Sequence, residues 1–409
     1  MTAVTARYDE LIETECDWLR EWRLVRASAA FEAALQLRPD CPIAHYLRGE
    51  ALYLARHLDK ALVCHAAALR LGLDGCVGGR GAAMSGMVPG DFAWMSHMLR
   101  GDFESAWQIA DRDRAARRRA GITGREWPRH MRPVWDGRTL AGTHVLVRCY
   151  HGLGDTIQFV RYLPLLAETA ASVQLEAQPA LLSLLAGLPG IQRLHALAAD
   201  QDRPIAAFGC DAEIEVTELP HGFRTRLDTV PADIPYLRPG PRRVAEARQR
   251  RARPGEGAAV GLVWAAGVWK PERSLALARL APLSRIPGVK LVNLQRGPEY
   301  ECWRASASKP AMAEIFDSDS ISAVAATIAA LDLVVTVDTM VAHLAGALGV
   351  PVWVMLHHAA DWRWLLDRRD SPWYPTMRLF RQPRPGDWDP VIAEIAAALR
   401  RQSVSAAIG

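Results

Sequence analysis

The fold of this chain is decided by the stretch Val334-Val335-Thr336-Val337-Asp338-Thr339-Met340-Val341-Ala342-His343-Leu344-Ala345-Gly346-Ala347-Leu348-Gly349. A β-branched run followed by small residues predicts a buried strand, a sharp turn and a helix. Free N–H groups and the helix dipole make such a helix start an anion site. Because Thr339 and His343 are one turn apart, both can face the ligand with Asp338. For His343 a packing role is the alternative.

Predicted strands and helices alternate along the chain from about residue 143 onward. This alternation predicts two doubly wound parallel sheets, which is an α/β fold. Strands are expected at residues 143–149, 173–177, 212–216, 258–264, 289–294, 333–337 and 350–356, and helices at 157–168 and 179–186. We predict a first Rossmann-like domain at 126–240, a Pro-, Gly- and Arg-rich linker at 241–257 and a second Rossmann-like domain at 258–409. A cleft between two such halves is a preferred place for a ligand.

An internal repeat marks the N-terminal part. Ala27, Phe31, Ala34 and Pro39 form one pattern, and its first three positions recur 34 residues later as Ala61, His65 and Ala68. This is the tetratricopeptide period, in which Gly49 would fill the small position where paired helices touch. A degenerate third unit is expected near residues 101–107, after an insertion within 74–90. We therefore predict tetratricopeptide-like helical repeats over 1–125, with an ordinary helical bundle as the alternative.

Composition excludes several classes of protein. The net charge of +4 over 409 residues demands no nucleic-acid partner. The seven cysteines are scattered without a CxxC pair, which favours reduced thiols and a cytoplasmic location. No signal peptide and no apolar run of membrane-spanning length is visible. The His, Cys and Asp spacings match no metal site, so no metal is expected.

A glycine turn follows the first predicted strand, in His151-Gly152-Leu153-Gly154-Asp155-Thr156. A third glycine would be needed for the dinucleotide fingerprint, so a nucleotide-dependent oxidoreductase is disfavoured. The two glycines let the backbone pass close to a ligand. Asp155 is either a helix cap or a general base facing an acceptor hydroxyl.

Two further blocks carry charge near predicted strand ends. Lys270 and Arg273 lie in a loop after the strand that ends at Trp264. They can neutralise phosphate or can be solvated surface cations. The block at residues 361–375 is dense in aromatic and Arg side chains. We expect most of it to pack at an interface, with Arg363 or Trp373 bordering the ligand.

Together these blocks resemble the heptosyltransferase-related glycosyltransferases of family 9, in the bacterial subgroup with N-terminal tetratricopeptide repeats. The resemblance runs through nearly the whole chain and rests on the segments Trp135-Asp136-Gly137-Arg138-Thr139-Leu140-Ala141-Gly142, Gly152-Leu153-Gly154-Asp155-Thr156-Ile157-Gln158-Phe159, Gly261-Leu262-Val263-Trp264, Val337-Asp338-Thr339 with Ala342-His343-Leu344-Ala345-Gly346-Ala347-Leu348-Gly349, and Asp361-Trp362-Arg363-Trp364-Leu365-Leu366. This chain departs from the family at Tyr150-His151, in a shortened loop at 266–273 and at 357–360.

The resemblance implies a GT-B fold, in which two Rossmann-like domains face each other and the C-terminal one holds a sugar nucleotide. It implies Asp155 as the catalytic base, Asp338 and Thr339 at the nucleotide sugar and Lys270 at phosphate, with no metal. With the anion-site argument, the expected donor and phosphate residues are Gly152, Gly154, Lys270, Arg273, Asp338, Thr339 and His343.

The sequence thus predicts a cytoplasmic, metal-independent glycosyltransferase that is hexosyl- or heptosyltransferase-like. It would use a nucleotide-sugar donor, a protein or surface-glycan-precursor acceptor and inversion at the anomeric carbon. Because repeats bind extended chains, they favour a protein acceptor or a protein partner. The alternative is a non-catalytic tetratricopeptide scaffold with a vestigial GT-B body.

Overall fold

The chain divides into two compact units. The computed structural model describes residues 17–73, 89–122, 129, 132, 134–198, 203–251, 257–267, 270–307, 309–314 and 320–408. The first unit comprises Met1–Ala116, Arg226–Asp228 and His358–Asp367; the second comprises Arg117–Thr225, Thr229–His357 and Arg368–Gly409. The division after Ala116 comes earlier than the boundary predicted at residue 125, and both sheets belong to the second unit.

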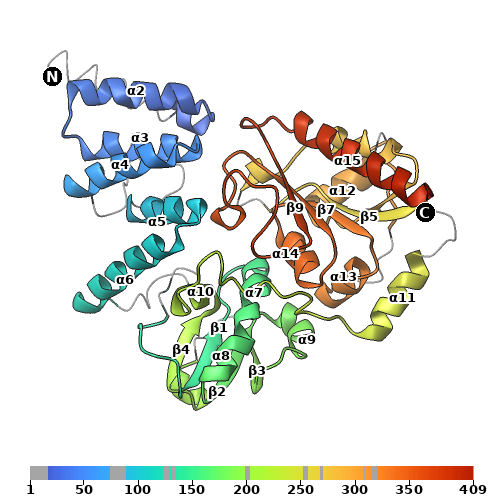
Figure 1. The fold of residues 1–409 in the computed structure, drawn as a ribbon, viewed down its shortest axis with the longest axis horizontal. Coiled ribbons are helices and arrows are strands. Elements are labelled where there is room, and N and C mark those ends of the chain that lie inside the picture. The colour runs from blue at the N-terminus through green and yellow to red at the C-terminus, as the bar shows by residue number, and fades with distance from the viewer. Residues whose placement is uncertain are drawn as a thin grey trace. The chain divides into compact units, whose positions relative to one another are not determined.

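The first unit is built mainly from helical hairpins, which are drawn in blue and cyan in Figure 1. Its helices are α2 (Leu24–Leu37), α3 (Pro42–Leu54), α4 (Leu58–Arg70), α5 (Pro89–Arg100) and most of α6 (Phe103–Arg119), and α2 packs on α3, α3 on α4 and α4 on α5. A Cβ on Gly49 would lie 2.3 Å from His65 Nε2, which confirms that paired helices touch at this glycine. The helical prediction is confirmed, and most of the expected insertion, residues 74–88, lies outside the described residues.

The second unit contains two separate sheets, and every strand pairing in them is parallel. The first sheet has the order β3-β2-β1-β4, with β1 at His144–Arg148, β2 at Ser172–Ala177, β3 at Arg193–Ala196 and β4 at Ala212–Glu215. The second sheet has the order β6-β5-β7-β8-β9, with β5 at Ala258–Val263, β6 at Val289–Asn293, β7 at Leu333–Val337, β8 at Val352–Leu356 and β9 at Met377–Arg381. The predicted α/β class is confirmed.

Helices and short 3-10 turns lie between the parallel strands, and α15 follows the last strand (Figure 1). In the first half they are α7 (Leu153–Phe159), α8 (Leu163–Thr169), α9 (Leu182–Leu185) and α10 (Leu219–Gly222); in the second half they are α12 (Pro298–Ala305), α13 (Ile321–Ile328), α14 (Met340–Ala347) and α15 (Asp389–Ile408). Short 3-10 turns are η2 (Val160–Tyr162), η3 (Pro179–Leu181), η4 (Ile205–Phe208), η5 (Val216–Glu218), η6 (Pro271–Arg273), η7 (Leu277–Leu280), η8 (Leu283–Arg285) and η9 (Trp362–Trp364). The single helix expected at 157–168 is therefore divided by η2, where Pro164 enters the first turn of α8.

The first part of the predicted linker at 241–257 forms helix α11 (Pro241–Arg251), which lies between the last strand of the first sheet and the first strand of the second. Pro241 stands at the helix start, where a missing N–H costs nothing, and the Arg, Ala, Glu and Gln residues that follow are good helix formers. At the other end, Arg251 donates to the carbonyl of Ala330 at 2.6 Å and pairs with Asp332.

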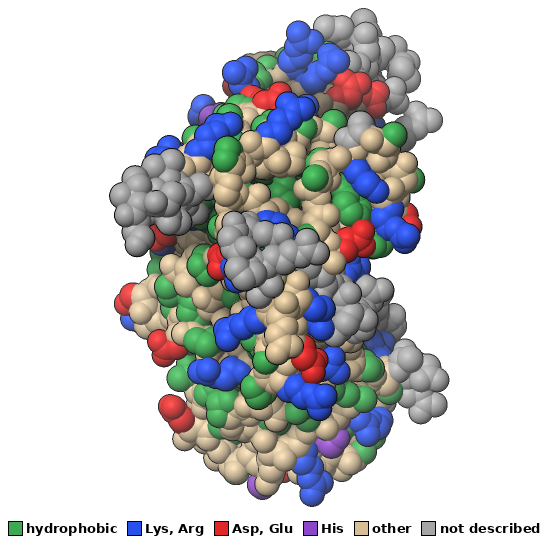
Figure 2. Space-filling model, turned by 90° about the vertical axis from the view of Figure 1, so that its right-hand side faces the viewer, with side chains coloured by type: hydrophobic (Ala, Val, Ile, Leu, Met, Phe, Trp, Pro, Cys, Tyr) green, Lys and Arg blue, Asp and Glu red, His purple; other side chains and the backbone are tan. Residues whose placement is uncertain are grey.

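Basic side chains are spread over the surface. On the face drawn in Figure 2, Lys and Arg alternate with acidic, hydrophobic and other side chains. No helix of the described residues is long and apolar enough to cross a membrane. Within the same residues, no group of three or more His, Cys, Asp or Glu side chains is arranged to hold a metal ion.

Candidate functional site

A pocket of about 560 Å³ opens at the carboxyl ends of three adjacent strands of the second sheet. β5 is the first strand of this sheet along the chain. The next two strands, β6 and β7, pair with opposite sides of β5. The connections therefore change direction at β5, which makes this the switch point where open α/β sheets bind ligands. The lining comes from the segments after these strands and from α13: Val263, Ala265, Ala266, Gly267, Lys270, Arg273, Leu294, Gln295, Arg296, Gly297, Ile321, Val324, Asp338, Thr339, Met340 and Val341.

The start of α14 forms one wall of this pocket. The Thr339 hydroxyl accepts the Val341 N–H at 3.3 Å, so Thr339 caps the helix. Asp338, the residue before it, is buried and lines the pocket. Its carboxylate lies 3.4 Å from the Arg273 guanidinium. The partial positive charge of a helix start thus adds to a fixed cation at the same wall.

Among the described residues of the lining, Lys270, Arg273 and Arg296 carry positive charge and Asp338 carries the carboxylate. Lys270 and Arg273 stand at η6, and the hydroxyl of Ser274 accepts the Ala266 N–H at 3.0 Å, which ties the ends of this loop together. Arg296 was not predicted. Its signal was its place shortly after the strand that ends at Asn293, since the carboxyl ends of neighbouring parallel strands meet at one edge. The excess of positive charge suits an anionic ligand.

The floor of the pocket is rigid and partly apolar. Gln295 Oε1 accepts the backbone N–H groups of Trp264 at 3.1 Å and Ala265 at 3.0 Å, and Asn293 Oδ1 accepts the N–H of Gln295 at 2.8 Å. These bonds hold the ends of β5 and β6 at a fixed separation. Apolar side chains cover part of the lining: Val263, Leu294, Ile321, Val324 and Val341. Such a mixture fits a ligand with a flat apolar ring and an anionic group.

His343 packs in the interior, which was the alternative to a ligand contact in the sequence analysis. It is buried, lies outside the pocket lining and bonds through Nδ1 to the Tyr374 hydroxyl at 3.0 Å. A Cβ on Gly154 would lie 3.1 Å from His343 Cδ2. His343 therefore supports the contact between α14 and α7 rather than the pocket surface.

The glycine turn brings α7 against the start of α14. A Cβ on Gly154 would lie 3.4 Å from Met340 Cα, so a glycine is needed where the two helices approach. Neither Gly152 nor Gly154 is among the residues that line the pocket. The Asp155 carboxylate accepts the Gly152 N–H at 3.1 Å, which is a helix-capping contact.

The first sheet has its own switch point, because β2 and β4 lie on opposite sides of β1. Its strand ends carry a charged cluster that the sequence did not predict. Arg148 donates to Glu176 at 2.7 Å and to Glu213 at 2.8 Å, and Glu215 is buried beside them at the end of β4. Glu213 and Glu215 are two residues apart at a strand end, and this spacing was the signal that was missed.

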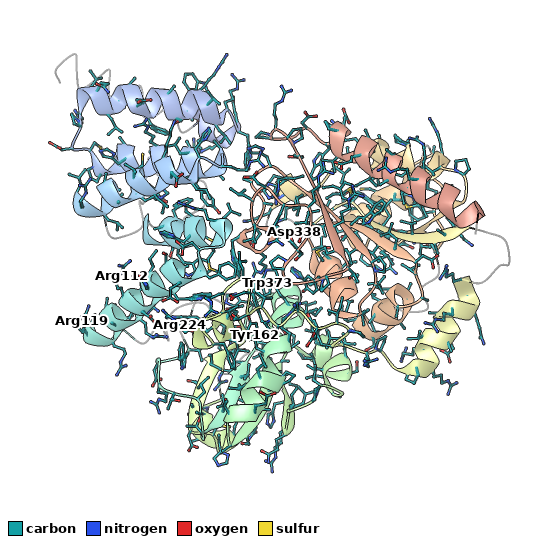
Figure 3. The ribbon with its side chains drawn as sticks, in the orientation of Figure 1. Arg112, Arg119, Tyr162, Arg224, Asp338 and Trp373 are labelled. Atoms are coloured by element: carbon teal, nitrogen blue, oxygen red, sulfur yellow. The ribbon has the colours of Figure 1, made fainter. Side chains whose placement is uncertain are left out.

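The aromatic block at 361–375 is used for packing. In the first unit, Trp362 makes edge contacts with Trp94 and Phe103, and Arg363 pairs with Asp361 at 2.9 Å. In the second unit lies Trp373, which Figure 3 labels. The carbonyl of Trp373 accepts a hydrogen bond from Arg161. Neither Arg363 nor Trp373 lines the pocket, so the expectation that one of them borders a ligand finds no support there.

Comparisons with known proteins give distant likenesses. No family model matches the chain. The chain is 29% identical over 287 residues to Protein FlbA of Caulobacter vibrioides, a match that covers 65% of this chain and 48% of that protein, so the chain spans about half the length of this relative.

Solved structures with some likeness include the glycosyl transferase family 9 protein of Veillonella parvula, at 15% identity and a TM-score of 0.44, covering 64% of this chain and 90% of that one. Another is the ADP-heptose LPS heptosyltransferase II of E. coli, at 13% identity and a TM-score of 0.45, covering 63% and 99%. At these scores the likenesses establish neither the fold family nor the activity of this chain.

Proposed function

We propose that this protein is a glycosyltransferase of the GT-B class, related to family 9, that transfers a sugar from a nucleotide-sugar donor. The observation that carries the proposal is the pocket at the β5–β7 switch point, where Lys270, Arg273 and Arg296 meet the start of α14. The cations and the helix start would hold the diphosphate, and the apolar lining would hold the base of the nucleotide.

The mechanism follows from the charge that develops during transfer. As the glycosidic bond breaks, the leaving nucleoside diphosphate gains negative charge. Lys270, Arg273 and Arg296 stabilise that charge together with the N–H groups at the start of α14, so the reaction needs no metal. Asp155, on the glycine turn that packs against Met340, is the base that the resemblance suggests, and attack on the face opposite the leaving group gives inversion.

The acceptor in this proposal is a protein or a surface-glycan precursor, and the reaction takes place in the cytoplasm. The N-terminal helices support a protein acceptor or partner, because stacked helical pairs of the tetratricopeptide kind bind extended chains. This assigns the helical unit to acceptor recognition and the second unit to chemistry.

A non-catalytic scaffold is the second candidate. The observation that favours it is the capping bond from Gly152 to Asp155, which uses the predicted base within its own helix turn. In that case the helical unit would bind a partner and the pocket would be vestigial.

Donor binding separates the two candidates. The full chain is titrated with ADP-, UDP-, GDP- and CMP-sugars, and its thermal unfolding is followed. We expect at least one donor to raise the Tm and Arg273→Ala to weaken its affinity by about 10- to 100-fold, the range for one lost charge-assisted bond. Arg285→Ala is the matched control, since Arg285 is exposed and lies outside the lining. If no donor binds at millimolar concentration, the enzyme proposal is wrong.

A further inference from the structure

His151 and Glu215 meet at the switch point of the first sheet. His151 follows β1, and Glu215 is the last residue of β4, the strand on the other side of the switch. The donor pocket has the equivalent position in the second sheet. Since α7 follows β1 and its Gly154 packs on Met340 of the pocket lining, the pair lies on the first-sheet side of the same junction. This is where an acceptor hydroxyl would have to be activated.

The geometry of the pair is fixed by hydrogen bonds. His151 Nε2 lies 3.7 Å from Glu215 Oε2. Glu215 is buried and accepts the backbone N–H groups of Tyr150 at 3.2 Å and Thr217 at 2.6 Å. The backbone carbonyl of His151 accepts from Gln178 Nε2 at 2.7 Å, while its side chain is 33% exposed. An anchored carboxyl group therefore lies at ion-pair distance from an imidazole that is partly exposed.

The charge state of Glu215 supports proton exchange. Burial raises the pKa of Glu215 to about 8, with a further rise from Glu218, while the Thr217 and Tyr150 hydrogen bonds lower it. Cys149, also close to Glu215, stays neutral because burial raises its thiol pKa well above the usual value. A carboxyl that titrates near neutral pH can share a proton with a neighbouring imidazole.

We infer that His151, positioned by Glu215, is the general base of the transfer reaction, an inference that rests on the proposed function. The acceptor hydroxyl oxygen bonds to the anomeric carbon, and the bond from that carbon to the diphosphate breaks with its electron pair. The hydroxyl proton passes to the imidazole and then to solvent, and Glu215 stabilises the imidazolium. Asp155 then keeps the capping role that its bond to Gly152 gives it.

The test uses the full chain, a nucleotide sugar that raises its Tm, and release of the nucleotide with water as acceptor. We expect His151→Gln to lower kcat by about 100-fold or more with the donor KM unchanged. Glu215→Gln lowers kcat less and moves the acid limb of the pH–kcat profile to lower pH, which a purely structural role would not do. His144→Gln, at the amino end of the same strand, is the matched control and keeps wild-type kcat.

The outcomes separate this inference from the proposed function. If wild type binds no donor, or binds without releasing nucleotide, the glycosyltransferase proposal falls and this inference falls with it. If wild type releases nucleotide and His151→Gln does so within twofold, only the role of His151 is overturned. Loss of release in Asp155→Asn but not in His151→Gln would return the role of base to Asp155. Donor-induced Tm shifts of each variant verify that it is folded.

Discussion

At the scale of single residues, burial gives different acid–base properties to side chains of the same type. His65 and His151 show the contrast. His65 is fully buried in the helical unit and stacks on Phe92 with ring centroids 4.9 Å apart, whereas His151 is partly exposed beside a carboxylate. One histidine is a packing residue and the other has the surroundings of an acid–base group.

His65 makes the stability of the helical unit depend on pH. Burial lowers its pKa from 6.5 to about 4, so the folded state resists protonation. The neutral His65 therefore contributes fully to the free energy of unfolding above pH 6.5. As the pH falls from about 6.5 to about 4, the free energy of unfolding decreases by up to about 3 kcal/mol. Hydrogen exchange of α3 and α4 peptides, corrected for intrinsic rates, should show increasing opening over this range.

His65→Leu supplies the comparison for this prediction, because leucine cannot be protonated. The pH dependence between 6.5 and 4 should flatten in α3 and α4 of the variant. An equally steep dependence in the variant would assign the effect to another group.

At the scale of elements, the contact between α7 and α14 organises the site. The start of α7, which follows β1, and the start of α14, which follows β7, approach each other at Gly154 and Met340. Their N–H groups place positive partial charge on both sides of the junction. Gly154 permits this close approach of the two helices, since a Cβ there would lie 3.1 Å from His343 Cδ2.

Replacing Gly154 with alanine tests this contact. The new Cβ would be 3.4 Å from backbone of Met340 and 3.1 Å from His343, so α7 or α14 must move by a few tenths of an ångström. We expect Gly154→Ala to lower the free energy of unfolding by about 1–2 kcal/mol, despite the better helix propensity of alanine. Chemical denaturation measures this value. Gly187→Ala, where a Cβ meets nothing within 4 Å, should change it by less; equal effects would refute the packing role of Gly154.

At the scale of the whole molecule, the second unit is held together by a buried cation. Arg161 of the first half donates to the carbonyls of Pro231 and Trp373 and to the Tyr236 hydroxyl, and its guanidinium lies 4.4 Å from the Tyr374 ring centroid. A planar guanidinium can donate to these oxygens and stack on the ring at the same time, whereas an ammonium group cannot. The C-terminal segment around Trp373 is thereby fixed to the first half.

We expect Arg161→Lys to lower the free energy of unfolding of the second unit by about 3 kcal/mol, because several charge-assisted bonds are lost together. Urea denaturation followed by far-UV circular dichroism measures the change. Arg193→Lys, an exposed position on β3, is the control and should stay within about 0.5 kcal/mol. A loss for Arg161→Lys no larger than that of the control would contradict the role of Arg161.

The sequence by itself determined the elements whose signal is local. The run at 334–349 predicted β7 and α14, and apolar runs predicted the inner strands β1, β2, β5, β7 and β8. The two strands that it missed, β3 and β9, are edge strands. The other two edge strands, β4 and β6, were predicted, so edge position alone does not explain the difference. Both missed strands are interrupted by polar residues, Arg193 and His195 in β3 and Arg378 and Arg381 in β9, which leaves only short apolar runs.

Tertiary structure alone decided which of the polar residues share a site. Arg296 joins Lys270 and Arg273 because β6 lies beside β5, and Glu215 meets His151 because β4 lies beside β1. Strand order is set by the packing of all the elements together. The chain near each residue shows that the residue stands at a strand end, but not which strands lie side by side. For the same reason His343, one turn from Thr339, faces Tyr374 rather than the pocket.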